Sequence, residues 1–433
     1  MNLLHANDRP GEYPASYYAA TAAPLARFPV VEGEITADVC IVGGGFTGLS
    51  AALHLAARGI SVALLEAHRV GFGASGRNGG QVGTGQRHDQ QTLEDMLGVQ
   101  IARQLWALGE NAKSLLQDLI LRHDMPVTFY PGIAHACGSQ AEVRDSHRNA
   151  EKLARDYGYS QIEPLDGAAL GRLVGSKVYK GGDIDRGAGH LHPLNYAIGL
   201  AQAAAKAGAG LYECSEVKRI DHGTTVHVHT AKGVVKAKHM ILACNGYLGK
   251  LDGAVASRVM PINSYIIATE PLGEQAREII AEPVAVTDTK FVNNYWRLSE
   301  DGRLLFGGAE TYGYRFPEVI RAVSRPMLTV YPQLRDTRID YAWGGTLAIT
   351  VNRLPCFIRP YPNVLSASGF SGYGVAMAGM AGKVMAEAIA GQAGQFDLMA
   401  SLPQPRFPGG TSLRWPMLVL AMTWYSMRDR LGL

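Results

Sequence analysis

Residues 37–66 read ADVCIVGGGFTGLSAALHLAARGISVALLE, and this order of residue types is the strongest structural signal in the chain. A short β-branched run over 37–42 stops at glycine, which predicts a strand followed by a tight turn. The Ala- and Leu-rich segment 49–58 predicts a helix, and residues 61–65 predict a second strand that ends in Glu66. This order of elements is typical of a dinucleotide-binding unit: a strand, a glycine turn, a helix, a second strand and an acid.

The glycines of the turn each have a physical role in such a unit. Gly43 permits the tight turn, Gly45 lets the backbone approach a pyrophosphate, and Gly48 lets the helix pack closely on the strand. Phe46 and Thr47 complete the turn and lead into the helix. The N-terminus of that helix offers unpaired N–H groups and a partial positive charge to phosphates.

The acid that ends the second strand, Glu66, is placed to accept hydrogen bonds from a ribose diol, and Ala67 follows it. A glycine-rich turn that serves only the path of the chain is the alternative interpretation. That alternative requires all the features of the unit to coincide by chance.

A second glycine-rich segment, residues 71–81, reads GFGASGRNGGQ. It is flexible and polar, so its backbone amides are available to a more distant part of a long cofactor. An NAD-binding unit would continue into another helix here, so the segment favours FAD; a mobile surface loop is the alternative. The residues expected to line the cofactor site are Gly73, Ala74, Ser75, Arg77, Asn78, Gly79, Gly80 and Gln81.

Composition limits the remaining function classes. The chain has 433 residues, of which 51 are Gly, and its 41 Lys and Arg against 38 Asp and Glu give a net charge of +3. A chain of this length is expected to hold two or three cores. The balanced charge gives no electrostatic reason to expect a nucleic-acid partner. The glycines show no three-residue period, which excludes a collagen-like chain.

The cysteines are far apart and form no CxxC pair, so we expect no metal site. The pattern favours reduced, buried thiols of an intracellular protein, one or two of them lining a pocket. Residues 1–30 lack the features of a signal peptide, and there is no long uncharged apolar run, so we expect a cytoplasmic protein without a transmembrane segment. Residues 416–425 (PMLVLAMTWY) predict a buried or interfacial helix. The cysteines are Cys40, Cys137, Cys214, Cys244 and Cys356.

The GGGFTG turn, Glu66 and the GASGRNGGQ segment together resemble the FAD-dependent amine and amino-acid oxidases of the D-amino-acid oxidase type, which include sarcosine oxidase and glycine oxidase. That family has a further glycine turn before a C-terminal helix. Here residues 363–368 predict a strand, 369–374 (GFSGYG) the turn and 375–390 the helix. The resemblance implies that this turn faces the flavin and that FAD contacts include Gly369, Ser371, Gly372, Gly374, Val217, Ala243 and Gly345.

The likeness extends along the chain to the γ-glutamylputrescine oxidase subgroup. Residues 82–89 (VGTGQRHD) depart from that subgroup, which leaves the substrate open. Sarcosine oxidases of this type hold FAD through a cysteine before the final glycine turn, but residues 343–350 (WGGTLAIT) contain none. Cys356 lies too near that turn, so we expect FAD to be bound non-covalently. The matching stretches are 16–20 (SYYAA), 189–195 (GHLHPLN), 295–298 (YWRL), 303–308 (RLLFGG) and 425–432 (YSMRDRLG).

The expected fold class is α/β. A Rossmann-like FAD-binding domain of glutathione-reductase-type topology is interleaved with an α+β substrate domain on a mostly antiparallel sheet. We expect the FAD-binding domain over 37–95, 181–255 and 339–395, and the substrate domain over 96–180 and 256–338. Residues 1–36 would be an N-terminal extension and 396–433 a C-terminal tail.

The resemblance implies an amine oxidase. Hydride would pass from the amine carbon to N5 of FAD, and the imine would hydrolyse to an aldehyde and ammonia, with H2O2 formed from oxygen as acceptor. The implied substrate is γ-glutamylputrescine or a similar amine in polyamine catabolism. A sarcosine, glycine or other amino-acid oxidase or dehydrogenase of the same fold is one alternative, and a non-catalytic flavin-binding protein is another.

Candidate substrate-side residues follow from this chemistry. His190 and His192 could deprotonate a bound ammonium, or could be hydrogen-bonded to the backbone at a domain crossing. Tyr295 and Trp343 could form apolar walls for an aliphatic amine, or belong to the core. Arg353 could pair with a substrate carboxylate, or form a structural salt bridge.

Tyr373 lies inside the third glycine turn. It could contact both the substrate and the flavin ring, or pack on the cofactor alone.

Overall fold

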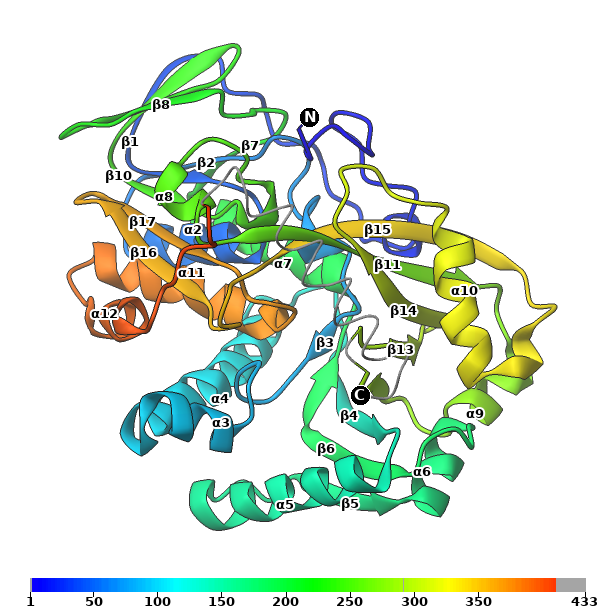
Figure 1. Cartoon of the computed structure of the whole chain (residues 1–433). Helices are drawn as coiled ribbons and strands as arrows, with labels where there is room; N and C mark the ends of the chain where they lie inside the picture. The colour runs from blue at the N-terminus through cyan, green and yellow to red at the C-terminus, as the bar shows by residue number, and fades with distance from the viewer. Residues whose placement is uncertain (1, 291, 410–433) are drawn as a thin grey trace.

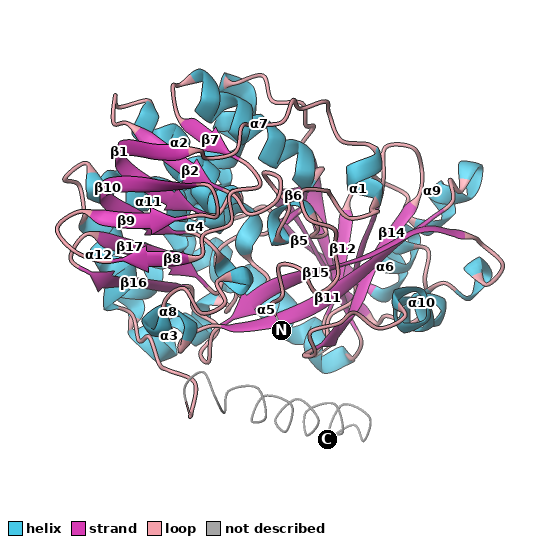
Figure 2. Ribbon diagram, turned by 90° about the horizontal axis from the view of Figure 1, so that it is seen from above, coloured by secondary structure: helices cyan, strands magenta, loops and turns pink. Residues whose placement is uncertain are grey.

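The structure is a computed structural model that describes residues 2–290 and 292–409. Two β-sheets with their covering helices form two lobes (Figure 1). Figure 2 separates the stacked strands of the first sheet from the long strands β11 (Met260–Thr269) and β15 (Ile339–Ile349) of the second.

The first sheet is built mainly from parallel strands. Such strands are covered on both faces, which explains why β2 and β17 are buried throughout. In spatial order the strands are β16 (Cys356–Tyr361), β17 (Val364–Ser368), β10 (Gly233–Leu242), β1 (Gly33–Val42), β2 (Val62–Leu65) and β7 (Gly210–Tyr212), with β8 (Arg219–Asp221) and β9 (Val226–His229) paired beside β10.

Helices from four separate parts of the chain share one apolar core with this sheet. Leu49 of α2, Leu116 of α4, Leu200 of α7 and Met385 of α11 are all buried in that core, which Phe396 of α12 completes. The helices are α2 (Phe46–Ala56), α3 (Gln90–Leu97), α4 (Val99–Arg122), α7 (Pro193–Lys206), α11 (Gly374–Ile389) and α12 (Gly394–Ser401).

The second sheet is mostly antiparallel, with one parallel pair between β12 and β4. Its core is centred on Trp296, Phe306 and Tyr331. In spatial order the strands are β15, β11, β14 (Leu304–Thr311), β13 (Tyr295–Leu298), β12 (Ala285–Asp288), β4 (Tyr130–Cys137), β6 (Gly181–His190) and β3 (Gln81–Val82), with β5 (Ile162–Asp166) also paired to β6. The associated helices are α5 (Gln140–Tyr157), α6 (Gly167–Val174), α9 (Ala276–Ile279) and α10 (Val319–Val330).

A β-bulge changes the face on which β14 presents its last residues. Glu310 pairs with Ser264 of β11, but the register shifts between Ser264 and Tyr265, which leaves Ala309 as the extra residue. Ala309 has a φ of +60°, in the left-handed region that non-glycine residues seldom adopt. Strict alternation would place Glu310 on the same face as Phe306, in the core of the second sheet. The bulge turns it to the opposite face, with Ser264.

The expected interleaved α/β architecture is present, but the sheets divide the chain differently at two expected boundaries. Strands β6 and β15 lie in the second sheet, although 181 and 339 were the expected starts of FAD-binding segments. The glycine-rich sequence of β6 does not indicate which sheet it joins, because antiparallel pairing with β4 decides that. Helix α4 was expected in the substrate domain, yet its apolar stripe packs in the core of the first lobe.

Two smaller expectations also differ from the structure, and a third is not tested by it. Strand β1 begins at Gly33, before the expected start at residue 37. Cys214 is exposed, whereas Cys40, Cys137 and Cys356 are buried. The helix expected over 416–425 lies outside the described residues.

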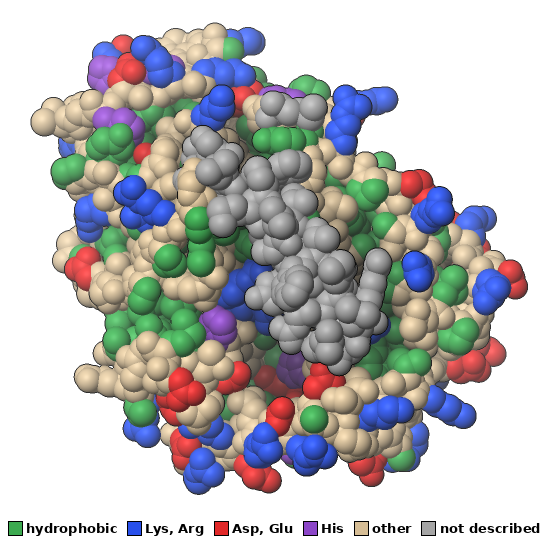
Figure 3. Space-filling model, viewed as in Figure 1, with side chains coloured by type: hydrophobic (Ala, Val, Ile, Leu, Met, Phe, Trp, Pro, Cys, Tyr) green, Lys and Arg blue, Asp and Glu red, His purple; other side chains and the backbone are tan. Residues whose placement is uncertain are grey.

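Both signs of charge are interspersed on the face seen in Figure 3, in keeping with a net charge of +3. Within residues 2–290 and 292–409, no helix is long and apolar enough to cross a bilayer. The same residues contain no group of three or more His, Cys, Asp or Glu side chains that could hold a metal ion.

Candidate functional site

A cavity of about 1450 Å³ is lined by residues of both lobes. Its first-lobe wall lies where β1, β2 and β10 end, at Gly43–Thr47, Glu66 and Ala243. Ligands of open α/β sheets bind beyond the carboxyl ends of the strands. The volume exceeds the roughly 300–1,000 Å³ of ordinary small-molecule pockets, which suits a long cofactor together with a substrate.

The first glycine turn is closely packed. A Cβ on Gly43, whose φ is +111°, would lie 2.7 Å from the Ala243 carbonyl oxygen, and one on Gly48 would lie 1.9 Å from the Gly43 oxygen. A Cβ on Gly45 would lie 2.8 Å from Ser75 Oγ. At Gly43 and Gly48 the added Cβ would meet backbone atoms, so no larger residue fits there and α2 approaches β1 closely.

Glu66 is a buried carboxylate in the cavity wall, 8% exposed. It accepts hydrogen bonds from the Gly44 N–H at 2.7 Å and the His68 N–H at 2.9 Å. Burial raises its pKa to about 6. Since a carboxylate has roughly four lone-pair sites, it keeps acceptor capacity for ligand hydroxyls.

The buried guanidinium of Arg77 lies in the same cavity wall. Its Nε donates to the Phe72 carbonyl at 2.6 Å, and its Nη1 lies 3.0 Å from Asp8 Oδ2 of the N-terminal segment. Its Nη2 has no hydrogen-bond partner among the described residues. A buried donor of this kind fits a bound group that carries acceptor oxygens, as a dinucleotide does.

The segment after Arg77 is held by side-chain hydrogen bonds. Asn78 Nδ2 donates to the Ala74 carbonyl at 2.9 Å, and Asn78 Oδ1 accepts from the Gly80 N–H at 2.7 Å. The Trp343 indole donates to the Arg77 carbonyl at 3.0 Å. The segment is therefore a fixed part of the cavity wall, and the mobile-loop alternative does not fit it.

The third glycine turn brings the N-terminus of α11 to the cavity. Gly372 (φ +94°) and Ser371 (φ +52°) adopt left-handed conformations, and the Ser371 N–H donates to the Ala348 carbonyl at 3.1 Å. The first residues of α11, from Gly374 onward, line the cavity. A helix N-terminus stabilises negative charge on a bound group.

Three of the expected substrate-side residues line the cavity: Tyr295, Arg353 and Tyr373. The Tyr295 hydroxyl lies 3.2 Å from Ser264 Oγ, and its ring fills the space beside Gly79. Arg353 has a φ of +61°, and its guanidinium donates no hydrogen bond to a described residue. Burial lowers the pKa of Arg353. The arrangement offers two aromatic walls and an unpaired cation.

Glu310 is an acid in this part of the cavity that sequence reasoning missed. It accepts one hydrogen bond, from the Tyr312 hydroxyl at 3.4 Å, and forms no ion pair within the described part of the chain. Burial raises its pKa, and the nearby charges of Arg353 and Arg87 act in the opposite direction. No local pattern identifies it, because the bulge at Ala309 decides its direction.

His190 does not line the cavity. Its Nε2 lies 3.0 Å from the Pro283 carbonyl oxygen, and its ring stacks on Tyr130 at 5.3 Å. Burial, with a smaller contribution from Arg297, lowers its pKa to about 3. The structural interpretation of this histidine fits better than the catalytic one.

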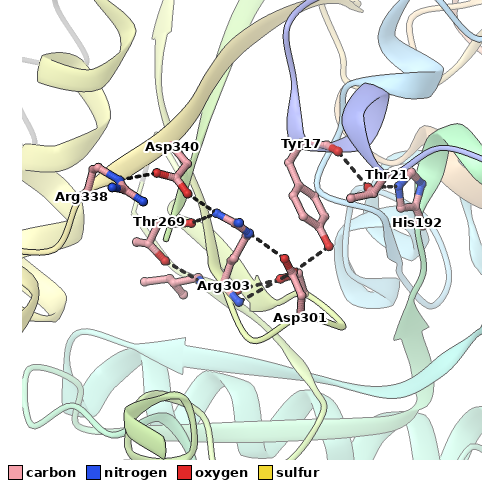
Figure 4. Close-up of polar contacts among 10 residues, drawn as sticks. Tyr17, Thr21, His192, Thr269, Asp301, Arg303, Arg338 and Asp340 are labelled. Carbon is pink, nitrogen blue, oxygen red and sulfur yellow. Dashed lines mark hydrogen bonds and ion pairs between the residues drawn. The ribbon is translucent and has the colours of Figure 1, made fainter. Parts of the chain in front are cut away.

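His192 is the N-cap of α7 and also lies away from the cavity. Its Nδ1 accepts from the Asn195 N–H at 3.1 Å, and its Nε2 lies 3.1 Å from Thr21 Oγ1 (Figure 4). Burial lowers its pKa to about 3. Trp343 does not line the cavity either and packs against Tyr18, with ring centroids 5.2 Å apart.

The residues expected to contact FAD gather around one cavity. Three of them, Gly48, Gly80 and Gly369, do not line it. Each lies behind the wall, where neighbouring atoms leave no room for a side chain. The residues that line it are Gly43, Gly45, Phe46, Thr47, Glu66, Ala67, Gly73, Ala74, Ser75, Arg77, Asn78, Gly79, Gln81, Val217, Ala243, Gly345, Ser371, Gly372 and Gly374.

Other lining residues were not expected from sequence. Leu4 comes from the N-terminal segment, and Tyr247 follows the Asn245–Gly246 turn and accepts from the Thr346 N–H at 3.2 Å. Cys137 and Cys244 also line the cavity, which agrees with the expectation that one or two thiols reach a pocket.

The model of the FAD dependent oxidoreductase (DAO) family matches residues 38–388. The chain belongs to this family. Its cofactor is therefore FAD, as the glycine segments predicted, and the family and fold expected from sequence are confirmed.

Two curated relatives match almost the whole chain. Gamma-glutamylputrescine oxidoreductase of Escherichia coli (strain K12) is 42% identical over 424 residues, which cover 97% of this chain and 99% of that protein. The probable oxidoreductase OrdL of Rhizobium meliloti (strain 1021) is 42% identical over 417 residues, 96% of this chain and 97% of that protein. Among solved structures, glycine oxidase from Geobacillus kaustophilus has a TM-score of 0.72 at 22% identity and covers 86% of this chain and 99% of that one.

Proposed function

We propose that this oxidoreductase oxidises a primary amine, with γ-glutamylputrescine or a similar N-acylated diamine as substrate. The supporting observation is the 42% identity to gamma-glutamylputrescine oxidoreductase of Escherichia coli, which extends over nearly all of both chains. The overall reaction consumes amine, oxygen and water and yields aldehyde, ammonia and H2O2. Oxygen is the acceptor in this proposal.

The cavity residues divide into two groups in this proposal. The pyrophosphate is held by Gly43–Thr47 and the N-terminus of α2. Glu66 binds the ribose, and Val217 contacts the adenine end. The 73–81 segment and the third glycine turn, residues 369–374, hold the flavin half. When FAD is bound, it accepts a hydride from the amine carbon.

The chain's own residues orient the substrate. Tyr295 and Tyr373 supply aromatic walls for an aliphatic diamine chain. Arg353, whose guanidinium has no hydrogen-bond partner among the described residues, holds the α-carboxylate of a γ-glutamyl group. Three residues, His190, His192 and Trp343, lie outside the cavity and make no contact with substrate in this proposal.

The flavin is non-covalent in this proposal. Cys356 is buried in β16 and does not line the cavity. Burial raises the pKa of the two cavity cysteines, Cys137 and Cys244, to about 12, which keeps them as unreactive thiols. Acid precipitation of the holoenzyme should release all the yellow colour into solution; colour that stays in the pellet would contradict this point.

The direct test is anaerobic bleaching of the holoenzyme by a panel of amines. We expect γ-glutamylputrescine to bleach the flavin faster than putrescine, sarcosine or glycine, and admitted air to restore the colour with formation of H2O2. Bleaching by sarcosine or glycine alone would favour an amino-acid oxidase. Bleaching without H2O2 formation on aeration would favour a dehydrogenase. If no amine bleaches the flavin, the result would favour a non-catalytic flavin-binding protein.

Arg353 gives a sharper test of the substrate. The variant Arg353→Gln should raise KM for γ-glutamylputrescine at least tenfold but leave KM for N-acetylputrescine, which lacks the carboxylate, nearly unchanged. An equal effect on both amines would remove Arg353 from carboxylate binding.

A further inference from the structure

Glu310 is a cavity carboxylate to which the arrangement described so far gives no task. It lies on β14 opposite Ser264 of β11, and Ser264 in turn contacts the Tyr295 hydroxyl at 3.2 Å. The Tyr295 ring lies against Gly79 of the segment that holds the flavin half in our proposal. Glu310 therefore lies beside Tyr295, next to the segment that holds the flavin half in our proposal.

This carboxylate forms no ion pair within residues 2–290 and 292–409. Its one hydrogen bond comes from Tyr312, a neutral hydroxyl, at 3.4 Å. Arg353 and Arg87 are near enough to influence it but form no ion pair with it. A half-buried carboxylate without an ion-pair partner loses part of its hydration, so its placement in a cavity fits a cationic ligand.

The local backbone also singles out this residue. The bulge places Ala309 in a left-handed conformation, which is energetically unfavourable for a non-glycine residue. Its structural effect is to move Glu310 from the core face of β14 to the cavity face.

An amine substrate needs such a group. A primary amine arrives as an ammonium ion near neutral pH, and hydride can leave the adjacent carbon only when the nitrogen lone pair is free. Neither His190 nor His192 lines the cavity, so the proton must go elsewhere.

We propose that Glu310 binds the substrate ammonium and accepts one proton from it before hydride transfer. The N–H bond breaks, its electron pair stays on nitrogen, and a new O–H bond forms on the Glu310 carboxylate. The step needs no other reactant, and it rests on the proposed amine oxidation.

Four charged or titratable groups face Glu310, and the positive charges of the two arginines among them oppose its protonation. Tyr295 comes from β13, Tyr312 follows β14, Arg353 comes from the β15–β16 turn, and Arg87 from the segment after β3. Burial is the largest influence on Glu310 and raises its pKa, which makes it a better proton acceptor. Burial of the pair also favours neutral amine and acid over separate charges.

The test compares Glu310→Gln with wild type by anaerobic stopped-flow reduction of the flavin between pH 7 and pH 10. At pH 7 we expect Glu310→Gln to lower kcat/KM about 10²–10⁴-fold, the range of a positioned proton acceptor. The loss should shrink by about tenfold per pH unit, because free neutral amine then becomes available from a group that titrates near pH 10.4. Glu310→Asp should restore part of the rate at pH 7.

Glu300→Gln is the matched control, since Glu300 is an exposed carboxylate outside the cavity that only accepts from Tyr130 OH at 3.3 Å. Flavin content and thermal midpoint of every variant show whether it folds. A loss in Glu310→Gln that is the same at every pH, or no loss at all, would overturn the role of Glu310. If wild type itself is not bleached by any amine, the proposed function has failed instead.

Discussion

Asp8 and Arg77 form an ion pair at 3.0 Å that joins the N-terminal segment to the cavity wall. The side chains are only 8% and 1% exposed. Asp8 lies outside the part of the chain that matches the family model, which begins at residue 38. The N-terminal segment, which lies outside the residues matched by the family model, therefore orients the Arg77 guanidinium in the cavity wall.

We predict that Asp8→Asn weakens FAD retention. Removing one partner of a buried pair leaves an uncompensated charge, which costs about 3–5 kcal/mol. Flavin fluorescence after dilution of the holoenzyme should report a higher Kd for FAD. Glu12→Gln, an exposed change in the same segment, should have no effect; equal flavin release from both variants would show that Asp8 does not hold Arg77.

A methyl group on Gly48 should disrupt the first glycine turn. The new Cβ would lie 1.9 Å from the Gly43 oxygen, so α2 must move away from β1. We expect Gly48→Ala to lower the free energy of unfolding by about 3 kcal/mol, the upper part of the range for overpacking. Gly253→Ala is the control, because nothing lies within 4 Å of its added Cβ. Urea denaturation measures both, and a Gly48→Ala midpoint equal to wild type would refute the packing role.

Glu66 should give the flavin-free protein a distinctive pH dependence. Burial raises its pKa from 4.5 to about 6, so the folded state binds the proton more tightly than the unfolded state does. Its contribution to stability is present below pH 4.5 and is lost as pH rises through about 6, by about 2 kcal/mol. Urea denaturation of wild type should show this decline relative to Glu66→Gln. Parallel curves for the two proteins would mean that the carboxyl is not desolvated.

His192 should matter for stability and not for chemistry. Its Nδ1 caps α7 by accepting from the Asn195 N–H. We expect His192→Ala to cost about 1 kcal/mol and His192→Asn, which preserves a cap acceptor, much less. The rate of anaerobic flavin reduction per bound FAD should be unchanged in both. A large loss of that rate in His192→Asn would return the residue to the list of catalytic candidates.

The N-terminal segment illustrates contacts that only the folded chain creates. Tyr17 donates to Asp301 at 2.9 Å, and Asp301 and Asp340 both bind Arg303 (Figure 4). Tyr17 and Asp340 are far in the sequence from Asp301 and Arg303, and no local pattern relates them. The same holds for Asp8, whose role depends on where the segment docks.

The amino-acid sequence by itself determined the glycine turn and the acid of the first-lobe cavity wall. Gly43, Gly48 and Glu66 act over short distances along the chain, and a turn, a helix start and a strand end are local structures with local residue requirements. Most of the residues expected to contact FAD accordingly line one cavity.

Tertiary structure decided the substrate side. The direction of Glu310 depends on one extra residue in β14, and the alternation of strand residues reverses at such a bulge. His190 and His192 have the chemistry of proton acceptors, but packing buries them outside the cavity and keeps them neutral. The sequence specifies the type of each side chain directly. The face of the sheet on which a strand residue lies depends on strand register, which the tertiary structure decides.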